Sequence, residues 1–353
     1  MRVPRSLGTL LRVILILIDF LRMILIFILM RQKNHFPLSR RALLAGLGAL
    51  AVTPAYAASS SLNIVATTGM IADMARAVGG DQVVVKGLMG AGVDPHAYRQ
   101  TRSDIVAMTR ADAVLWHGLY LEAQMEDFFL DLSRKNAVHA IAETLDPALL
   151  VAHEDYEGRF DPHVWMDPDL WVQCVPAVVA ALSDLRPDAR GMFEANAASF
   201  VSEAQALSVY ARDLLTSVPA ERRVLLTAHD AFGYFGTAYD FEVMGIQGIS
   251  TESEAGLNRI GELVDLLVER QLPAVFVETS VSDRNVRALV EGAAAQGHEV
   301  IIGGSLFSDA MGPDGTYEGT WLGMIDHNVT TIARALGIDA PAGGRLGRLK
   351  AAA

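Results

Sequence analysis

Three histidines and one aspartate stand in loop-like settings where their side chains could bind a cation. His96 and His163 each follow an Asp-Pro pair, and His229 stands between an alanine and an aspartate. Asp309 ends a seven-residue stretch that is rich in glycine and serine. Neutral imidazole nitrogens and one carboxylate oxygen together suit a borderline divalent cation such as Zn2+. These four residues are the candidate metal ligands.

Spacing alone does not establish that they form one site. The four residues are 67, 66 and 80 positions apart, and no compact pair of histidines on one helical turn occurs. A single histidine in a loop is more often solvated or capping than ligating. Only a fold that brings distant loops together would make a metal centre of them.

The pattern of apolar residues predicts such a fold. Short apolar runs rich in β-branched residues alternate with longer amphipathic stretches from residue 61 onward, which is typical of an α/β protein with parallel sheets. The runs predict strands over residues 63–67, 83–88, 113–116, 137–141, 224–227, 242–247, 274–278 and 299–302. The stretches predict helices over residues 70–78, 102–110, 122–135, 256–270 and 320–336. Ligands of open parallel sheets bind beyond the carboxyl ends of the strands, which is where His96, His229 and Asp309 are expected.

One longer helix is predicted between the two groups of strands. Residues 188–218 contain no proline and repeat apolar residues with a helical period, and Pro187 and Pro219 bracket them. About 30 residues would extend over roughly 45 Å, long enough to run beside two lobes. The sequence therefore predicts an N-terminal lobe over residues 58–187, a linking helix over 188–218, a C-terminal lobe over 219–340 and an unstructured tail over 341–353.

Residues 1–57 are interpreted as an export signal. The Arg40-Arg41 pair, a short apolar run and an Ala-Tyr-Ala ending form a secretory signal, with cleavage expected after Ala57. The Ser-Arg-Arg start of this signal resembles a twin-arginine signal. The apolar stretch 7–30 is either a transmembrane helix or lies upstream of the true start. Its three charged residues would be costly in lipid and favour a start at Met30.

Cysteine usage and charge narrow the class of protein. Cys174 is the only cysteine, so an intramolecular disulfide, a thiolate metal cluster and a lipid anchor after Ala57 are all excluded. Eight of the 29 basic residues but only one of the 41 acidic residues lie within residues 1–57, so residues 58–353 carry a net charge of −19. Such a surface repels nucleic acid and anionic lipid and attracts cations. We expect a soluble, exported periplasmic protein without a nucleic-acid partner.

Four motifs together resemble one known family. They are residues 94–98 (DPHAY), 161–168 (DPHVWMDP), 227–235 (TAHDAFGYF) and 303–312 (GGSLFSDAMG). In this order they look like the four ligand motifs of the cluster A-I metal-binding proteins of ABC importers, and they are most similar to the treponemal-type zinc/manganese member.

The resemblance covers residues 61–338 and implies both a fold and a function. It implies two lobes, each a four-stranded mainly parallel sheet flanked by helices, joined by a rigid backbone helix. It also implies that His96, His163, His229 and Asp309 coordinate Zn2+ or Mn2+ as transported cargo. The expected partner is an inner-membrane ABC permease with its cytoplasmic ATPase, served by a monomeric carrier that is not an enzyme.

Two features of the sequence bear on which metal is carried. Members of this family dedicated to manganese typically have a glutamate as third ligand, whereas this chain has His229. Many zinc-dedicated members have a long loop rich in histidine before the second ligand, whereas residues 152–160 contain one histidine. Three imidazoles bind Zn2+ more tightly than Mn2+. Both metals stay open, with zinc favoured by intrinsic affinity.

Two other functions are weighed against this one. A periplasmic zinc hydrolase would leave a coordination position open to water beside a general base, and Asp230 is the only obvious spare acid near a motif. An adhesin-like surface protein would need a display device, and the sequence offers neither a lipid anchor nor a repeat array. Outside the four ligands, Glu278 is a candidate to orient a ligand imidazole, and His117 is interpreted as structural.

Overall fold

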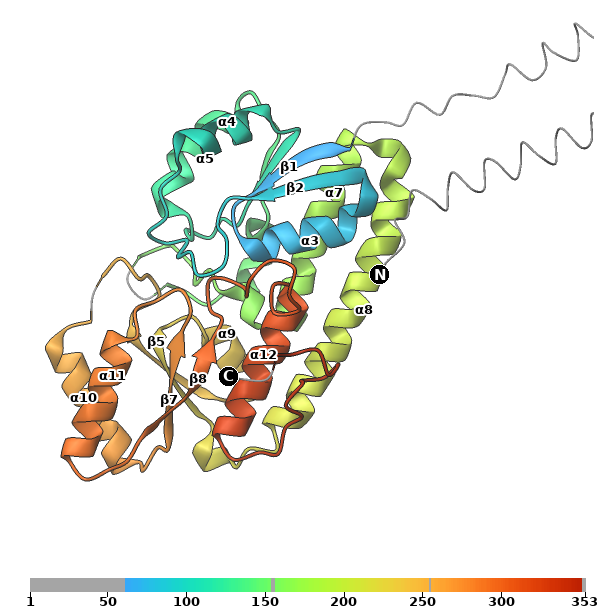
Figure 1. The fold of residues 1–353 in the computed structure, drawn as a ribbon. Coiled ribbons are helices and arrows are strands. Elements are labelled where there is room, and N and C mark those ends of the chain that lie inside the picture. Colours follow the sequence, from blue (N-terminus) through green and yellow to red (C-terminus); the bar gives the residue numbers. More distant parts are fainter. Residues whose placement is uncertain (1–60, 154–155, 254, 351–353) are drawn as a thin grey trace, which may run out of the picture. The chain divides into compact units, whose positions relative to one another are not determined.

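The computed structural model describes residues 61–153, 156–253 and 255–350 (Figure 1). The predicted export signal, its arginine pair, the start at Met30 and the apolar stretch 7–30 lie outside the described residues. Contacts between residues divide the chain into residues 1–59 and residues 60–353, so both predicted lobes belong to one compact unit. None of the helices in the described ranges has the length and apolarity needed to cross a membrane.

The N-terminal half, residues 61–189, contains a four-stranded parallel sheet. Its strand order is β2-β1-β3-β4, so β1 lies between β2 and β3, and helices connect the strands that follow one another in the chain. The four strands agree with the predicted ones to within two residues at each end. They are β1 Leu62–Ala66, β2 Val83–Gly87, β3 Ala113–Trp116 and β4 Val138–Ala140. The helices of this half are α3 Gly69–Gly79, α4 Arg102–Arg110, α5 Glu126–Ser133, α6 Pro168–Trp171 and α7 Val175–Leu185.

The predicted long helix is α8, Arg190–Leu215, with 26 residues and a length of about 39 Å. A stripe of buried side chains at spacings of three and four residues runs along it, from Phe193 to Leu215. This stripe packs against α3 and α7 of the N-terminal half and against α12 (Trp321–Ala335) of the C-terminal half (Figure 1). The largest apolar core accordingly contains side chains from both halves. Helix α8 is therefore a shared support for the two sheets.

The C-terminal half, residues 216–350, repeats the alternation of strands and helices. Its strands are β5 Val224–His229, β6 Glu242–Gln247, β7 Ala274–Glu278 and β8 Ile301–Leu306. The helices of this half are α9 Gly233–Tyr239, α10 Leu257–Glu269, α11 Arg284–Ala295 and α12.

The pairing of these strands differs from the expected single four-stranded sheet. Parallel ladders join β5 to β6 and β7 to β8, and β5 lies beside β7 without a continuous ladder between them. At this break the backbone N–H of His229 donates to the Glu278 side chain (2.9 Å) in place of a backbone carbonyl. The β7–β8 ladder has an irregularity of its own, a register shift between Val275 and Phe276.

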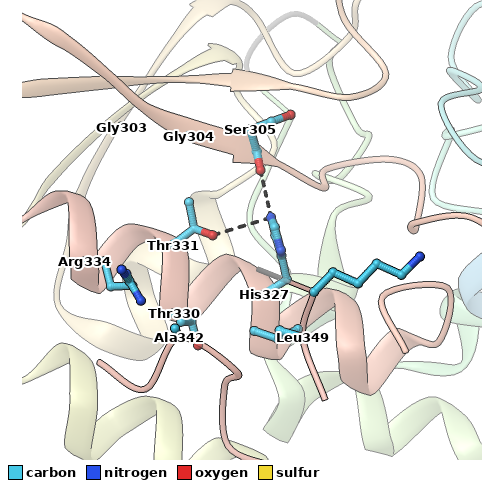
Figure 2. Close-up of a pocket in the computed structure, with 10 residues that line it drawn as sticks. Gly303, Gly304, Ser305, His327, Thr330, Thr331, Arg334, Ala342 and Leu349 are labelled. Carbon is cyan, nitrogen blue, oxygen red and sulfur yellow. Dashed lines mark hydrogen bonds between the residues drawn. The ribbon is translucent and has the colours of Figure 1, made fainter. Parts of the chain in front are cut away.

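The prediction of an unstructured tail is wrong for residues 341–350. The N–H of Arg345 donates to both carboxylate oxygens of Asp326 (2.9 and 3.0 Å), and the N–H of Lys350 donates to Glu318 (2.7 Å). Asp326 is fully buried, and a buried carboxylate is costly unless donors reach it. The tail supplies those donors and lies along α12, where Ala342 and Leu349 line one side of a cavity of about 390 Å³ (Figure 2).

Candidate metal centre

Two of the four candidate ligands lie in turns of the same construction. In the loop after β2, Asp94 Oδ1 accepts a hydrogen bond from the N–H of His96 (2.9 Å). In the loop before α6, Asp161 Oδ1 accepts one from the N–H of His163 (2.9 Å). An aspartate that bonds to the backbone two residues onward fixes a tight turn, and the intervening proline restricts the chain further. The Asp-Pro-His sequence therefore aims each imidazole by local chemistry.

The other two ligands lie at the carboxyl ends of strands. His229 is the last residue of β5, and Asp309 follows β8 by three residues. The Trp165 indole N–H donates to the carbonyl of Ser308 (2.9 Å), which ties the Asp309 loop to the N-terminal half. Each half thus contributes two of the four side chains.

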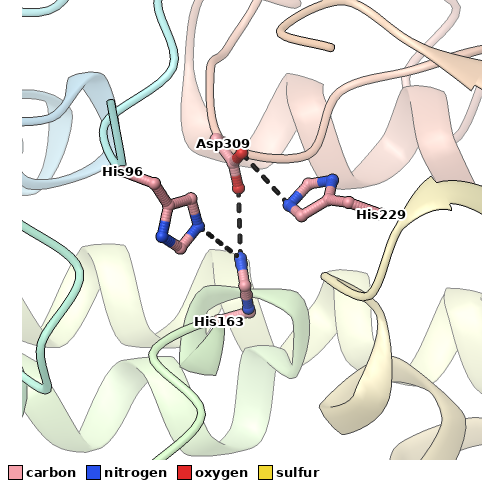
Figure 3. Close-up of side chains that lie close together, drawn as sticks. All are labelled: His96, His163, His229 and Asp309. Carbon is pink, nitrogen blue, oxygen red and sulfur yellow. Dashed lines mark hydrogen bonds and ion pairs between the residues drawn. The ribbon is translucent and has the colours of Figure 1, made fainter. Parts of the chain in front are cut away.

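The structure brings all four side chains together (Figure 3). One donor atom from each lies within 4.8 Å of every other. His163 Nε2 is 3.3 Å from His96 Nε2 and 3.2 Å from Asp309 Oδ1, and His229 Nε2 is 3.2 Å from Asp309 Oδ2. The rings of His163 and His229 are fully buried, while His96 is 4% exposed and Asp309 2% exposed. The cluster is nearly sealed from water.

Carboxylates behind two of the rings fix which nitrogen faces the cluster. Asp161 Oδ1 is 2.7 Å from His163 Nδ1, and Glu278 Oε2 is 2.5 Å from His229 Nδ1. A carboxylate accepts, so each Nδ1 carries a proton and a neutral ring turns the lone pair of Nε2 inward. Both lone pairs then meet the Asp309 carboxylate, whose two oxygens lack a hydrogen-bond donor, as does His229 Nε2. Acceptors facing acceptors at this distance require positive charge between them, either a metal ion or protons on the Nε2 atoms.

The distances suit a small cation. Four donors at about 2.0–2.1 Å from a tetrahedral Zn2+ are separated by about 3.3 Å from one another. Three of the six separations in the structure are 3.2, 3.2 and 3.3 Å, and the others lie within 4.8 Å. The donor set, its sealing and its spacing thus fit one divalent ion.

The carboxylates around the cluster also favour positive charge within it. Burial lowers the pKa of His163, but Asp161 and Asp309 outweigh burial and raise that pKa to about 9. The pKa of His229 is likewise raised, because Asp309 and Glu278 outweigh its burial. The pKa of Asp309 is lowered, since the two imidazoles outweigh the effect of burial. For His96, burial dominates and lowers the pKa to about 3. Without a metal, protons on His163 and His229 supply the positive charge.

Comparison with known proteins agrees with this geometry. Residues 64–335 match the sequence family described as zinc-uptake complex component A, periplasmic. The chain belongs to this family. The resemblance to cluster A-I binding proteins is thereby confirmed, and the family comprises solute-binding components of ABC import, which are not enzymes.

Individual members of the zinc-uptake family match over most of their length. The manganese-binding lipoprotein MntA of Bacillus subtilis is 46% identical over 280 residues, which are 79% of this chain and 91% of MntA. The zinc-binding protein TroA of Treponema pallidum is 46% identical over 273 residues, 77% of this chain and 88% of TroA. A solved structure of the periplasmic zinc-binding protein TroA superimposes with a TM-score of 0.76 and 45% identity, over 78% of this chain and 99% of that chain.

Other polar residues lie near this centre, and the sequence predicted the roles of some of them but not of others. The predicted orienting role of Glu278 is confirmed by its bond to His229. His117 lies outside the cluster, because its Nε2 bonds to the carbonyl of Pro162 (2.7 Å) and its ring stacks near Trp171. The orienting roles of Asp94 and Asp161 were missed, although the Asp-Pro-His sequence that appears twice is a signal for such a turn.

Proposed function

We propose that this chain captures Zn2+ or Mn2+ between His96, His163, His229 and Asp309 and delivers the ion to an inner-membrane ABC permease. One observation carries the proposal. Two imidazole lone pairs and two carboxylate oxygens face one another in a buried cluster whose donor atoms lie within 4.8 Å of one another. A metal site whose ligands come from both halves of a protein suits a carrier that binds and then releases an ion, because separation of the halves removes two donors at once.

The proposal includes both metals. Three imidazoles and one carboxylate favour Zn2+ over Mn2+ in affinity. Both oxygens of Asp309 face the cluster, and a carboxylate that offers two oxygens also suits Mn2+. One similar relative is named for manganese and another for zinc. We therefore propose that zinc binds more tightly than manganese, and that the availability of each metal decides which one occupies the site in the cell.

The carrier role has consequences for partners and location. We propose a monomer that works in the periplasm, with residues 58–187 and 219–340 as its two metal-binding lobes on either side of the linking helix. Cys174, the only cysteine, is buried and distant in sequence from Ala57, which supports a protein without a lipid anchor. The net charge of −19 on residues 58–353 favours basic side chains on the docking face of the permease.

Replacement of His229 tests the metal centre. The protein with His229→Ala should bind Zn2+ more weakly by orders of magnitude, measured by competition with a fluorescent chelator, because it removes one of four donors. His139→Ala is the matched control, since His139 lies in β4 outside the cluster and its loss should leave zinc affinity unchanged. Equal zinc binding by the wild type and the His229 variant would remove His229 from the site.

A second experiment tests the partner. The tagged full chain, loaded with zinc, should co-purify an ABC permease from solubilised inner membranes. Recovery of the chain in the periplasmic fraction after osmotic shock should accompany this result. Recovery only with the membrane after high-salt washing would contradict the proposed location.

A further inference from the structure

A small cavity leads from the surface to one side of the metal centre. It is lined by residues of both halves, and His96 is the only one of the four proposed ligands that lines it. Its volume is about 10 Å³, which is about that of one water-sized sphere. The rings of His163 and His229 are completely buried behind His96. This cavity is the side from which a single ion can reach His96 first.

Two side-chain hydrogen bonds join the halves around His96, one at this cavity through Glu252 and one at a separate cavity that Asp94 and Thr251 line. Thr251 Oγ1 donates to Asp94 Oδ2 (2.6 Å), and Gln124 Nε2 donates to Glu252 Oε1 (2.5 Å). Thr251 and Glu252 are neighbours in the loop after β6, and both of their partners lie in the N-terminal half. One short loop of the C-terminal half is therefore bonded to the N-terminal half at two points. Of the two bonds, the one from Thr251 is partly buried and the one from Gln124 is exposed.

The Thr251 bond reaches the metal centre through Asp94. One oxygen of Asp94 accepts from Thr251, and the other accepts from the N–H of His96 (2.9 Å). The position of the His96 backbone thus depends on a hydroxyl group that belongs to the opposite half.

The other two imidazoles are held differently. His163 is oriented by Asp161 within its own turn, and His229 by Glu278 of the neighbouring strand. Among the described residues, no carboxylate lies at Nδ1 of His96. His96 is therefore the imidazole whose ring is held least by its own half.

We propose that Thr251 is a positioning residue that holds His96 on the metal and so sets the rate of metal release. When the halves separate, the bond from Thr251 to Asp94 breaks and the His96 turn is freed, so His96 leaves the ion before the three more deeply buried ligands do. The loop of residues 250–252 is the latch. This inference rests on the proposed function, since it presupposes a metal at the four-residue centre.

Release kinetics test the latch. Zinc-loaded protein is mixed in a stopped-flow instrument with excess of a chromogenic chelator, and association is measured separately. With Thr251→Val, which keeps the shape and removes the donor, release should be about 10-fold to 100-fold faster, because a hydrogen bond to a charged group is lost. The association rate should stay within about twofold, since a bond broken during opening acts on dissociation. Thr109→Val is the matched control, because the Thr109 hydroxyl bonds only within its own helix and its loss should leave the rate of zinc release unchanged.

Three further variants separate positioning from a general loss of structure. Thr251→Ala should release zinc quickly and Thr251→Ser slowly, since only serine restores the hydroxyl group. With Asp94→Ala already in place, Thr251→Val should add no further acceleration, because the acceptor is gone. The melting temperature of the metal-free protein should be the same for the valine and wild-type proteins to within about 2 °C, which is about the shift that 1 kcal/mol produces in a protein of this size.

The outcomes distinguish this inference from the proposed function. Wild-type protein that binds no zinc would overturn both. Wild-type protein that binds zinc and releases it at the same rate as the Thr251→Val protein would overturn the latch alone. Acceleration by Thr251→Val that persists in full on the Asp94→Ala background would also overturn it.

Discussion

Two carboxylates orient imidazoles in this metal centre, and the structure predicts that neutralising them has unequal effects. Glu278 uses both oxygens on His229: Oε1 accepts from the backbone N–H and Oε2 from the ring Nδ1–H. Asp161 uses a single oxygen, Oδ1, for the same two donors of His163. An amide has one oxygen to accept with and one NH2 group that only donates.

With Glu278→Gln, only one of the two donors of His229 can keep an oxygen acceptor. With Asp161→Asn, both donors of His163 can keep theirs. The amide oxygen introduced by Glu278→Gln must face the backbone N–H, which leaves the NH2 group against Nδ1 of His229. The ring then accepts at Nδ1 and carries its proton on Nε2, which removes the lone pair that faces the metal. The amide introduced by Asp161→Asn can keep its oxygen on both donors of His163. We expect zinc affinity to fall about 100-fold for Glu278→Gln, at the upper end of what orienting partners contribute, and by less than about tenfold for Asp161→Asn.

Competition with a chelator of known zinc affinity measures this difference. The expected gap of at least tenfold corresponds to about 1.4 kcal/mol in binding free energy. Glu262→Gln is the matched control, since Glu262 lies exposed on α10 and makes no bond to the centre. Equal losses of zinc affinity in the two variants, or a greater loss for Asp161→Asn, would refute the argument from the number of oxygens that each carboxylate uses.

Three other outcomes follow from the described contacts. Trp165→Phe should destabilise the protein by about 1–3 kcal/mol in urea unfolding, because the Ser308 carbonyl loses its buried donor; an unchanged midpoint would contradict this. Burial raises the pKa of Glu122 to about 7 against the 4.5 of an unperturbed glutamate, so the native state binds more protons between these values and its stability should fall as pH rises from 4.5 to 7. This fall should amount to about 3 kcal/mol relative to Glu122→Gln, and parallel stability profiles of the two proteins would exclude it. Zinc binding at pH 7.5 should release protons from His163 and His229, whose pKa values are raised in the metal-free protein, and calorimetry in buffers of different ionisation enthalpy will detect them.

The fold was predictable where the pattern of apolar residues is strong. Each of the eight strands was predicted, and the predicted long helix overlaps α8 throughout its length, because burial imposes a regular spacing on its side chains. The pairing of β5 with β7 was not predictable. At this boundary the N–H of His229 is bonded to the Glu278 side chain, and such a side-chain bond gives no signal in the apolar pattern.

Some features of the candidate site were also predictable from the sequence, and others were not. The positions of His96, His229 and Asp309 after strands could be inferred from the rule for parallel sheets, and the structure does bring them together with His163. The bond from Thr251 to Asp94 joins residues 157 positions apart, and no local signal relates two such residues. The tail was misjudged because its sequence is rich in glycine and alanine, whereas its role depends on backbone N–H groups that satisfy Asp326 and Glu318.

The division of the four donors across α8 has a consequence for the lifetime of the protein. Two donors precede this helix and two follow it, so a cation at the centre acts as a cross-link between the beginning and the end of the folded chain. An ion present at a thousandfold excess over its dissociation constant would add about 4 kcal/mol to the free energy of unfolding. Proteases that act on transiently unfolded chains would then digest the metal-free protein first, and metal starvation would shorten the half-life of the protein that binds the metal.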